Sequence, residues 1–180
     1  MDIIRFKDAK VTEWSGGQTF EILIQPHGSN FKEGNYDLRI SIATVNLSST
    51  VFTPLPGVNR TLTVLEGNLK LIHDNSFEVY LKPFQQTSFS GDQSTRSEGK
   101  VRDFNVMWRN GNAKVKHISY SQNASVSIES RADVTLLFLA KGSFKCGEES
   151  IKESDSIVAH GALEIKTIDP CEIIQVSFDY

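Results

Sequence analysis

The stretch Leu62-Thr63-Val64-Leu65-Glu66-Gly67-Asn68-Leu69-Lys70-Leu71 decides the fold class of this chain. Apolar and polar side chains alternate on both sides of Gly67, with the period of two residues that β-strands show. The alternation stops at Glu66-Gly67-Asn68, where glycine can adopt the positive φ of a tight turn. The stretch therefore predicts a β-hairpin with its turn at Gly67.

The same pattern occurs again further along the chain. Leu137-Phe138-Leu139-Ala140-Lys141-Gly142-Ser143-Phe144-Lys145-Cys146 matches the first stretch 75 residues later, with leucine, glycine and lysine identical at corresponding positions. Two unrelated hairpins would also look alike, so that alternative stays open. A duplicated small antiparallel barrel explains the constant spacing. It predicts a single compact unit with halves of about residues 1–110 and 111–180, joined by a polar linker near residues 110–123.

Alternating apolar runs cover much of the remaining sequence. They lie at residues 20–24, 38–42, 77–81, 104–108, 126–128, 134–139, 157–159, 163–165 and 173–178. No segment has the period of a long helix, and residues 89–99 are expected to form a loop or one short helical turn. About a dozen short strands separated by Gly, Asn, Ser and Pro predict an all-β sandwich or barrel.

The composition limits the functional classes to consider. Among 180 residues, 22 acidic side chains outnumber 19 basic ones, and no dense basic run occurs, which argues against a nucleic-acid partner. No apolar stretch approaches the roughly 18 residues of a membrane-spanning helix, so no membrane partner is expected. The first residues lack the pattern of a secretory signal. The expected location is the cytoplasm, where Cys146 and Cys171 would stay reduced.

The sequence contains no motif for nucleotide binding, serine hydrolysis or zinc proteolysis. The four histidines are His27, His73, His117 and His160. None of them forms the His-x-His pair that commonly holds a metal in a small β-barrel. We therefore expect neither a metal nor another cofactor.

Two of the alternating runs place polar side chains on one strand face. Arg39 and Ser41 share such a face, as do Asn105 and Arg109, and apolar side chains occupy the opposite faces. If the polar faces line a lumen, arginine offers a bidentate fork for a small carboxylate, and Ser and Asn add orienting hydrogen bonds. Ordinary surface or ion-paired arginines are the alternative.

Three further side chains extend this candidate site. Arg60 follows a Pro-Gly turn and either reaches the same cavity or pairs with a carboxylate such as Asp103. Trp14 precedes two glycines and forms either a cavity rim or a side chain packed before a turn. Thr19 and Glu21, on the polar face of their strand, are expected to face solvent.

Several segments between residues 14 and 109 form a characteristic set. They are WSGGQT at 14–19, RISIATV at 39–45, FTPLPGVNR at 52–60, LEG at 65–67, FSGD at 89–92 and GKVRDFNVM at 99–107. As a set, in this order, they resemble the HutD/Ves family of cupin-like proteins. The resemblance implies an all-β, cupin-like fold made of two packed, bicupin-like halves. It also implies a non-enzymatic protein, linked to histidine utilisation or to stress, that binds or senses a small anionic metabolite such as urocanate or a formylated glutamate.

Two other functional classes stay open at this point. A metal-free cupin-type isomerase or lyase would need a general acid or base, from His, Tyr or Glu, in the cavity. An interaction protein would use exposed strand edges to form a homodimer. For the first class, a protein that binds a small polar or anionic ligand, the candidate binding residues are Arg39, Ser41, Arg60, Asn105, Arg109 and Trp14.

Overall fold

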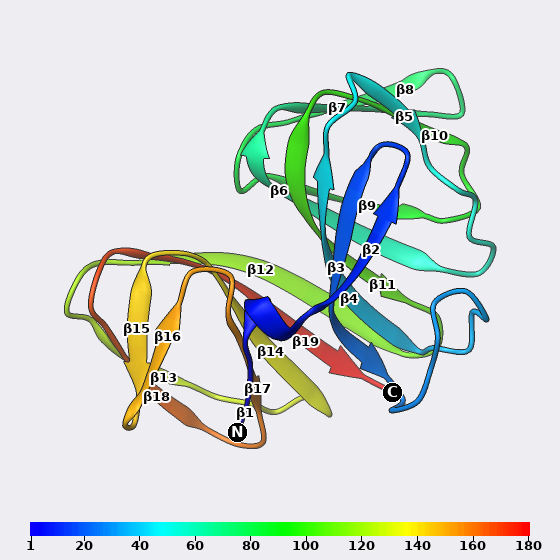
Figure 1. Cartoon of the computed structure of the whole chain (residues 1–180). Helices are drawn as coiled ribbons and strands as arrows, with labels where there is room; N and C mark the ends of the chain where they lie inside the picture. Colours follow the sequence, from blue (N-terminus) through cyan, green and yellow to red (C-terminus); the bar gives the residue numbers. More distant parts are fainter. The chain divides into compact units, whose positions relative to one another are not determined.

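A computed structural model describes all 180 residues, and it consists of β-strands, connecting loops and one 3-10 turn at Phe6–Asp8. The expected all-β class is confirmed. The chain divides into two compact units (Figure 1). The N-terminal unit comprises Lys10–Asn110, and the C-terminal unit joins Met1–Ala9 to Gly111–Tyr180. No helix in the structure has the length and apolar character needed to span a membrane.

The N-terminal unit contains a six-stranded and a four-stranded antiparallel sheet. The larger sheet has the order β2 (Lys10–Trp14), β3 (Gly17–Gln25), β4 (Leu38–Val45), β11 (Val101–Trp108), β6 (Asn59–Gly67), β9 (Gln86–Ser90). The smaller sheet has the order β5 (Ser49–Val51), β10 (Thr95–Glu98), β7 (Leu69–His73), β8 (Phe77–Leu81).

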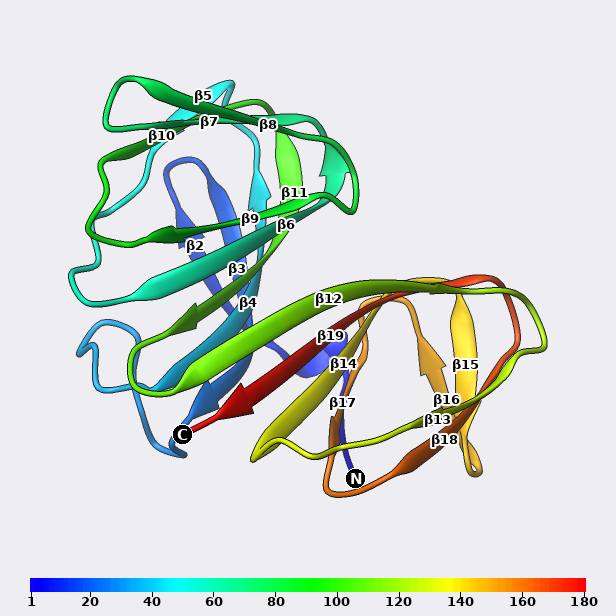
Figure 2. The same ribbon diagram turned by 180° about the vertical axis from the view of Figure 1, so that it is seen from behind.

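The C-terminal unit contains a five-stranded and a four-stranded antiparallel sheet, which Figure 2 shows from behind. The larger sheet has the order β1 (Asp2–Ile4), β17 (Ser156–Ala159), β14 (Val134–Lys141), β19 (Cys171–Asp179), β12 (Asn112–Tyr120). The smaller sheet has the order β13 (Ser125–Ile128), β18 (Leu163–Thr167), β15 (Ser143–Cys146), β16 (Glu149–Lys152).

The two units share one strand order. The series β4-β11-β6-β9 of the N-terminal unit corresponds to β12-β19-β14-β17, in which every strand comes eight places later in the chain. The small sheets correspond in the same way, since β5-β10-β7-β8 becomes β13-β18-β15-β16. The N-terminal unit adds β2 and β3 beside β4, and the C-terminal unit adds β1 beside β17.

The hairpin predicted at Gly67 is wrong. Strands β6 and β7 belong to different sheets and do not pair, and the same holds for β14 and β15 around Gly142. Gly67 has a φ of +86°, and a Cβ atom there would lie 2.4 Å from the Lys100 carbonyl oxygen. At Gly142 the corresponding distance, to the Pro170 carbonyl oxygen, is 2.2 Å. Each glycine thus lets a neighbouring backbone approach where the chain bends from one sheet to the other.

Three other expectations need correction. The strands of each unit divide between two sheets and do not close into a barrel, because bent chain segments connect the sheets without a continuous hydrogen-bonded ladder. Residues 112–120, expected in a linker, form β12, which pairs along its whole length with β19. Its side chains mostly alternate between exposed and partly buried, so one face of the strand is covered. The linker was predicted because the residues of this segment are largely polar. Residues 95–98, expected in a loop, form β10.

The interiors of the two units differ in polarity. In the C-terminal unit, apolar side chains such as Leu137, Phe144 and Ile165 form a continuous buried core. In the N-terminal unit, an apolar core that includes Leu62 and Leu71 fills one part of the interior. The remaining interior faces of β4 and β11 carry buried polar groups, namely Arg39, Ser41, Asp103 and Asn105. A polar ligand site is therefore expected in the N-terminal unit.

Candidate functional site

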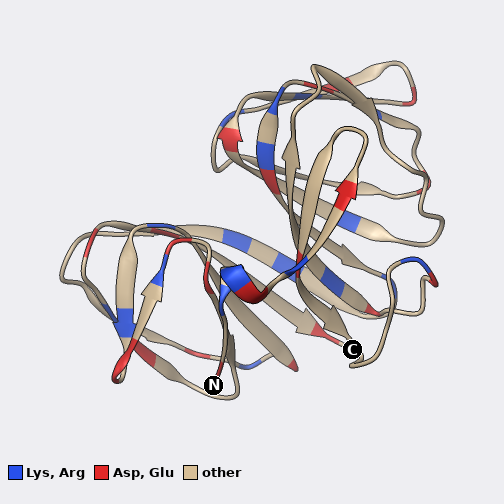
Figure 3. Ribbon diagram, viewed as in Figure 1, with Lys and Arg blue, Asp and Glu red and all other residues tan.

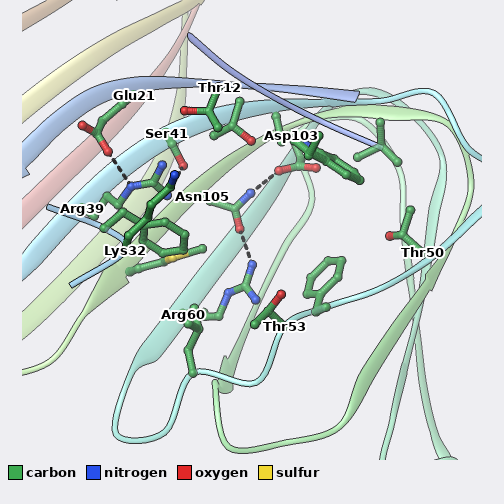
Figure 4. A pocket seen from close by; sticks show the side chains of 18 of the residues that line it. Thr12, Glu21, Lys32, Arg39, Ser41, Thr50, Thr53, Arg60, Asp103 and Asn105 are labelled. Carbon is green, nitrogen blue, oxygen red and sulfur yellow. Dashed lines mark hydrogen bonds and ion pairs between the residues drawn. The ribbon is translucent and has the colours of Figure 1, made fainter. Parts of the chain in front are cut away.

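The N-terminal unit contains a cavity of about 790 Å³. Its walls come from strands β2, β3, β4, β6 and β11 and from the chain segments at residues 30–32 and 47–55. Figure 4 shows polar side chains from several of these elements pointing into one space. The volume lies within the range of roughly 300–1,000 Å³ that is typical of small-molecule sites.

One side of the cavity is formed around Arg39, a buried residue of β4. Its Nε donates a hydrogen bond to Oε2 of Glu21 over 2.8 Å, and its Nη1 donates to Oγ of Ser41 over 3.2 Å. The guanidinium lies 4.1 Å from the ring centroid of Phe31. The Arg39 charge is therefore already neutralised by a carboxylate in direct contact.

The other side is formed around Arg60, in which only 7% of the residue surface is exposed. Its Nη2 donates to Oδ1 of Asn105 over 3.1 Å, while its buried Nε has no hydrogen-bond partner. The rings of Phe52 and Phe89 lie 4.7 and 5.1 Å from the guanidinium. Burial lowers the pKa of Arg60 to about 10, so the group is still charged at neutral pH. Arg60 is thus a buried cation with a donor that the protein leaves unused.

Asp103 lies beyond Asn105 in the same hydrogen-bonded chain. Nδ2 of Asn105 donates to Oδ1 of Asp103, so the amide separates the carboxylate from Arg60. Burial raises the pKa of Asp103 to about 7, and the charge of Arg60 and the hydrogen bond from Asn105 limit this rise. At neutral pH the carboxyl group is therefore close to half ionised.

This raised pKa predicts a pH-dependent stability. A carboxyl group whose pKa is higher in the folded chain, about 7 against 3.8, destabilises the fold as pH rises from about 4 through 7. Asp103→Asn removes this titration. We expect the variant to gain about 2–3 kcal/mol over the wild type between pH 5 and pH 8. Urea denaturation at both pH values measures this, and a constant difference between the two proteins would contradict the assignment.

The cavity has a local charge that differs from that of the whole chain. Lys10 and Lys32 line it together with the two arginines, against the carboxyl groups of Glu21 and Asp103. The full chain carries a net charge of −3, with Lys, Arg, Asp and Glu interspersed over the strands (Figure 3). A few inward-facing arginines can nevertheless create a positive potential inside a negatively charged protein. The geometry therefore favours an anion, held beside Arg60 and against phenylalanine rings.

The structure brings together five of the six candidate binding residues. The cavity is lined by Trp14, Arg39, Ser41, Arg60 and Asn105. Trp14 contributes as a partly exposed side chain that also covers Gly16, where a Cβ atom would lie 2.0 Å from the indole ring. The two interpretations of Trp14, as lining and as packing before a turn, thus both describe its position.

Arg109 lies outside the lining of the cavity. Its Nη1 donates to the carbonyl oxygen of Pro56 over 3.2 Å, and its guanidinium lies 5.6 Å from the ring centroid of Tyr36. Strand β11 ends at Trp108, so the alternation that carries Asn105 to the interior no longer governs Arg109. Arg109 instead holds two loop segments.

Sequence reasoning missed several lining groups. Glu21 and Thr19, expected to face solvent, line the cavity, because their face of β3 turns toward the polar interior. Phe31 and Phe52 lie outside the strands, where periodicity gives no signal. The two alternatives for Arg60 turn out to be connected, since it lines the cavity and reaches Asp103 through Asn105.

The donor groups do not fit a divalent metal ion. No three His, Cys, Asp or Glu side chains come together in an arrangement that could hold one. The groups nearest to Asp103 and Asn105 include the Arg60 guanidinium, which has donors only and cannot act as a ligand. The groups that line the cavity therefore suit an anion better than a divalent cation.

Several solved structures share this architecture. The conserved protein PA5104 from Pseudomonas aeruginosa PAO1 aligns with a TM-score of 0.84 at 23% identity, over 99% of this chain and 98% of that chain. HutD from Pseudomonas fluorescens SBW25 aligns with a TM-score of 0.76 at 23% identity, over 99% of both chains. A cupin 2 conserved barrel domain protein from Leptotrichia buccalis aligns with a TM-score of 0.61 at 11% identity, over 99% and 96%. The fold is thus all-β and cupin-like.

Sequence comparisons agree with the motifs found between residues 14 and 109. The protein Ves from Citrobacter koseri is 28% identical over 167 residues, which cover 89% of this chain and 83% of that protein. The model of the HutD family matches residues 6–173. Because this match spans most of the sequence, the chain belongs to the HutD family.

Proposed function

We propose that this chain is a non-enzymatic protein that binds or senses a small carboxylate anion in the cavity of its N-terminal unit. The observation that carries the proposal is the buried Arg60 guanidinium, whose Nε has no partner within the protein. Leaving a buried charged donor unsatisfied is costly, and an anion in the cavity would satisfy it. The ring of Phe52, which lines the cavity beside the guanidinium, would cover the apolar part of such a ligand.

The identity of the anion forms the finer part of the proposal. The resemblance to the HutD/Ves family links the HutD branch to histidine utilisation. Urocanate and formylglutamate are therefore the first ligands to test, because both are small acids formed in histidine breakdown. We place the protein in the cytoplasm, with a small anion as its partner and neither nucleic acid nor membrane.

We also propose that the two units are duplicated cupin-like halves. The shared strand order, with every strand eight places apart, supports this. The bends at Gly67 and Gly142 support it further, since both glycines admit a neighbouring carbonyl oxygen at the same point of the topology. In this view the C-terminal half has filled its interior with apolar side chains, and the N-terminal half has kept the ligand cavity.

A metal-free isomerase or lyase is the second candidate function. It is favoured by Asp103, an acid in the cavity whose pKa of about 7 suits a group that transfers protons near neutral pH. Product formation from urocanate or formylglutamate, lost in Asp103→Asn, would favour this candidate over simple binding.

Thermal unfolding with a panel of acids tests the proposed function. We expect urocanate, formylglutamate or formate to raise the melting temperature, while histidine methyl ester, which lacks a carboxylate, has no effect. At a concentration about 100 times the Kd, binding adds about 2.7 kcal/mol. This corresponds to a rise of roughly 5–10 °C for a chain of this size. The proposal fails if no acid shifts the melting temperature of the wild type and Arg39→Ala behaves like the wild type in the same assay.

A further inference from the structure

The hydrogen-bonded chain from Asp103 through Asn105 to Arg60 connects a buried acid with the proposed anion position. We propose that Asp103 is a proton-binding site that fills when an anion binds at Arg60, so that the cavity takes up a carboxylate together with a proton. This inference rests on the proposed function. It assigns to Asp103 a role in ligand affinity that does not require contact with the ligand.

The orientation of the Asn105 side chain determines how Arg60 and Asp103 are linked. Its Oδ1 accepts the hydrogen bond from Nη2 of Arg60, so its Nδ2 points toward Asp103 and donates to Oδ1 of that residue. Oδ1 of Asp103 can accept this bond whether the carboxyl group is ionised or neutral, since a protonated acid keeps one acceptor oxygen. A proton can therefore be added at Oδ2 without rearranging the hydrogen-bonded chain.

The balance of charges in the cavity favours protonation of Asp103 when an anion binds. When Asp103 is ionised, its carboxylate balances the buried Arg60 cation through the amide of Asn105. A carboxylate ligand beside Arg60 would bring a second negative charge into the same poorly solvated space, and like charges there raise each other's affinity for protons. Burial, partly offset by the Arg60 charge and the Asn105 hydrogen bond, brings the pKa of Asp103 to about 7, so adding the proton costs little near neutral pH. Protonation restores the original net charge.

The other groups around Asp103 leave it as the acid that responds. Its partners on the neighbouring strands are Ala43 of β4 and Val64 of β6, neither of which titrates. The remaining charged groups that line the cavity are Lys10 of β2, Glu21 of β3, Arg39 of β4 and Lys32 of the loop after β3.

Each of these groups is already compensated or exposed. Glu21 is in direct contact with Arg39, and the side chains of Lys10 and Lys32 reach solvent. His73 of β7 lies behind the Phe89 ring, 4.8 Å away between ring centroids, and burial lowers its pKa. Burial thus disfavours a positively charged imidazole at His73, so this side chain does not add a second cation for the anion.

Calorimetric titration with formate tests the proposal. Titrations at one pH, in buffers with different enthalpies of ionisation, give the number of protons taken up per anion. We expect about half a proton at pH 7, rising toward one at pH 8, and above this a loss of affinity of nearly tenfold per pH unit. Asp103→Asn is expected to bind formate without proton uptake. Glu66→Gln, which removes an exposed carboxylate of β6 outside the cavity lining, is expected to retain the uptake.

A second measurement, on the wild-type protein, does not depend on the folding of any variant. The side-chain carboxyl carbon of Asp103, followed by ¹³C NMR, is expected to titrate near pH 7 without formate and at higher pH with it. Formate binding without proton uptake, or an Asp103 carboxyl that does not respond, overturns the proposal and leaves the proposed function intact. If formate and urocanate both fail to bind, the proposed function falls and this inference falls with it.

Discussion

Gly67→Ala is expected to lose about 2–4 kcal/mol of unfolding free energy, because two costs combine at this bend. Alanine is strained at a φ of +86°, and its Cβ would lie 2.4 Å from the Lys100 carbonyl oxygen and 3.2 Å from Cγ1 of Val101. The Lys100 carbonyl cannot retreat easily, since the next residue, Val101, begins β11 and pairs with Val45 of β4. Urea denaturation at pH 7 measures the loss.

Gly147→Ala provides a matched control for this prediction. Gly147 also has a positive φ, +59°, but a Cβ atom there would meet nothing within 4 Å. It should lose only the conformational cost of about 1–2 kcal/mol. Gly142→Ala, at the corresponding bend of the other unit, should resemble Gly67→Ala. If Gly67→Ala and Gly147→Ala lose the same unfolding free energy, the close approach of two backbones at Gly67 does not contribute to stability.

These glycines also show what the sequence can reveal about the fold. Alternation of apolar and polar residues predicts strands, because the polarity of each side chain indicates whether its own position is buried. The all-β class follows directly from this alternation. A strand–glycine–strand pattern, however, is the same for a hairpin and for a strand that bends between sheets. The difference lies in the pairing partners, which for β6 are β11 and β9 and for β7 are β10 and β8. Those partners lie further along the chain, outside any local pattern.

The same limit applies to the cavity. Arg39, Ser41 and Asn105 could be predicted, because the alternation of β4 and β11 continues unbroken through them. On β3, a register shift between Glu21 and Leu23 changes the parity, so Ile24 lies on the same face as Glu21. The run at residues 20–24 therefore does not share one face, as its alternation suggested. A bulge is set by pairing between strands, and apolar spacing alone does not reveal it.

Arg60→Met is expected to weaken anion binding by about 10- to 100-fold, the loss of one or more charge-assisted hydrogen bonds in a buried site. Methionine retains much of the side-chain volume beside Phe52 and Phe89. Because the Arg60 guanidinium has no carboxylate in direct contact, the unfolding free energy should fall by no more than about 1–3 kcal/mol, the cost of leaving Oδ1 of Asn105 without its donor. Loss of binding in a protein that stays folded would distinguish a ligand group from a structural one.

Titration of formate into the wild type, Arg60→Met and Arg109→Met tests the central claim of an anion site at Arg60 most directly. Arg109 is the matched control, since its Nη1 binds the Pro56 carbonyl oxygen and its side chain does not line the cavity. We predict that Arg60→Met binds formate about 10- to 100-fold more weakly, while Arg109→Met keeps the wild-type affinity. Equal affinities in all three proteins, or a loss confined to Arg109→Met, would contradict an anion site at Arg60.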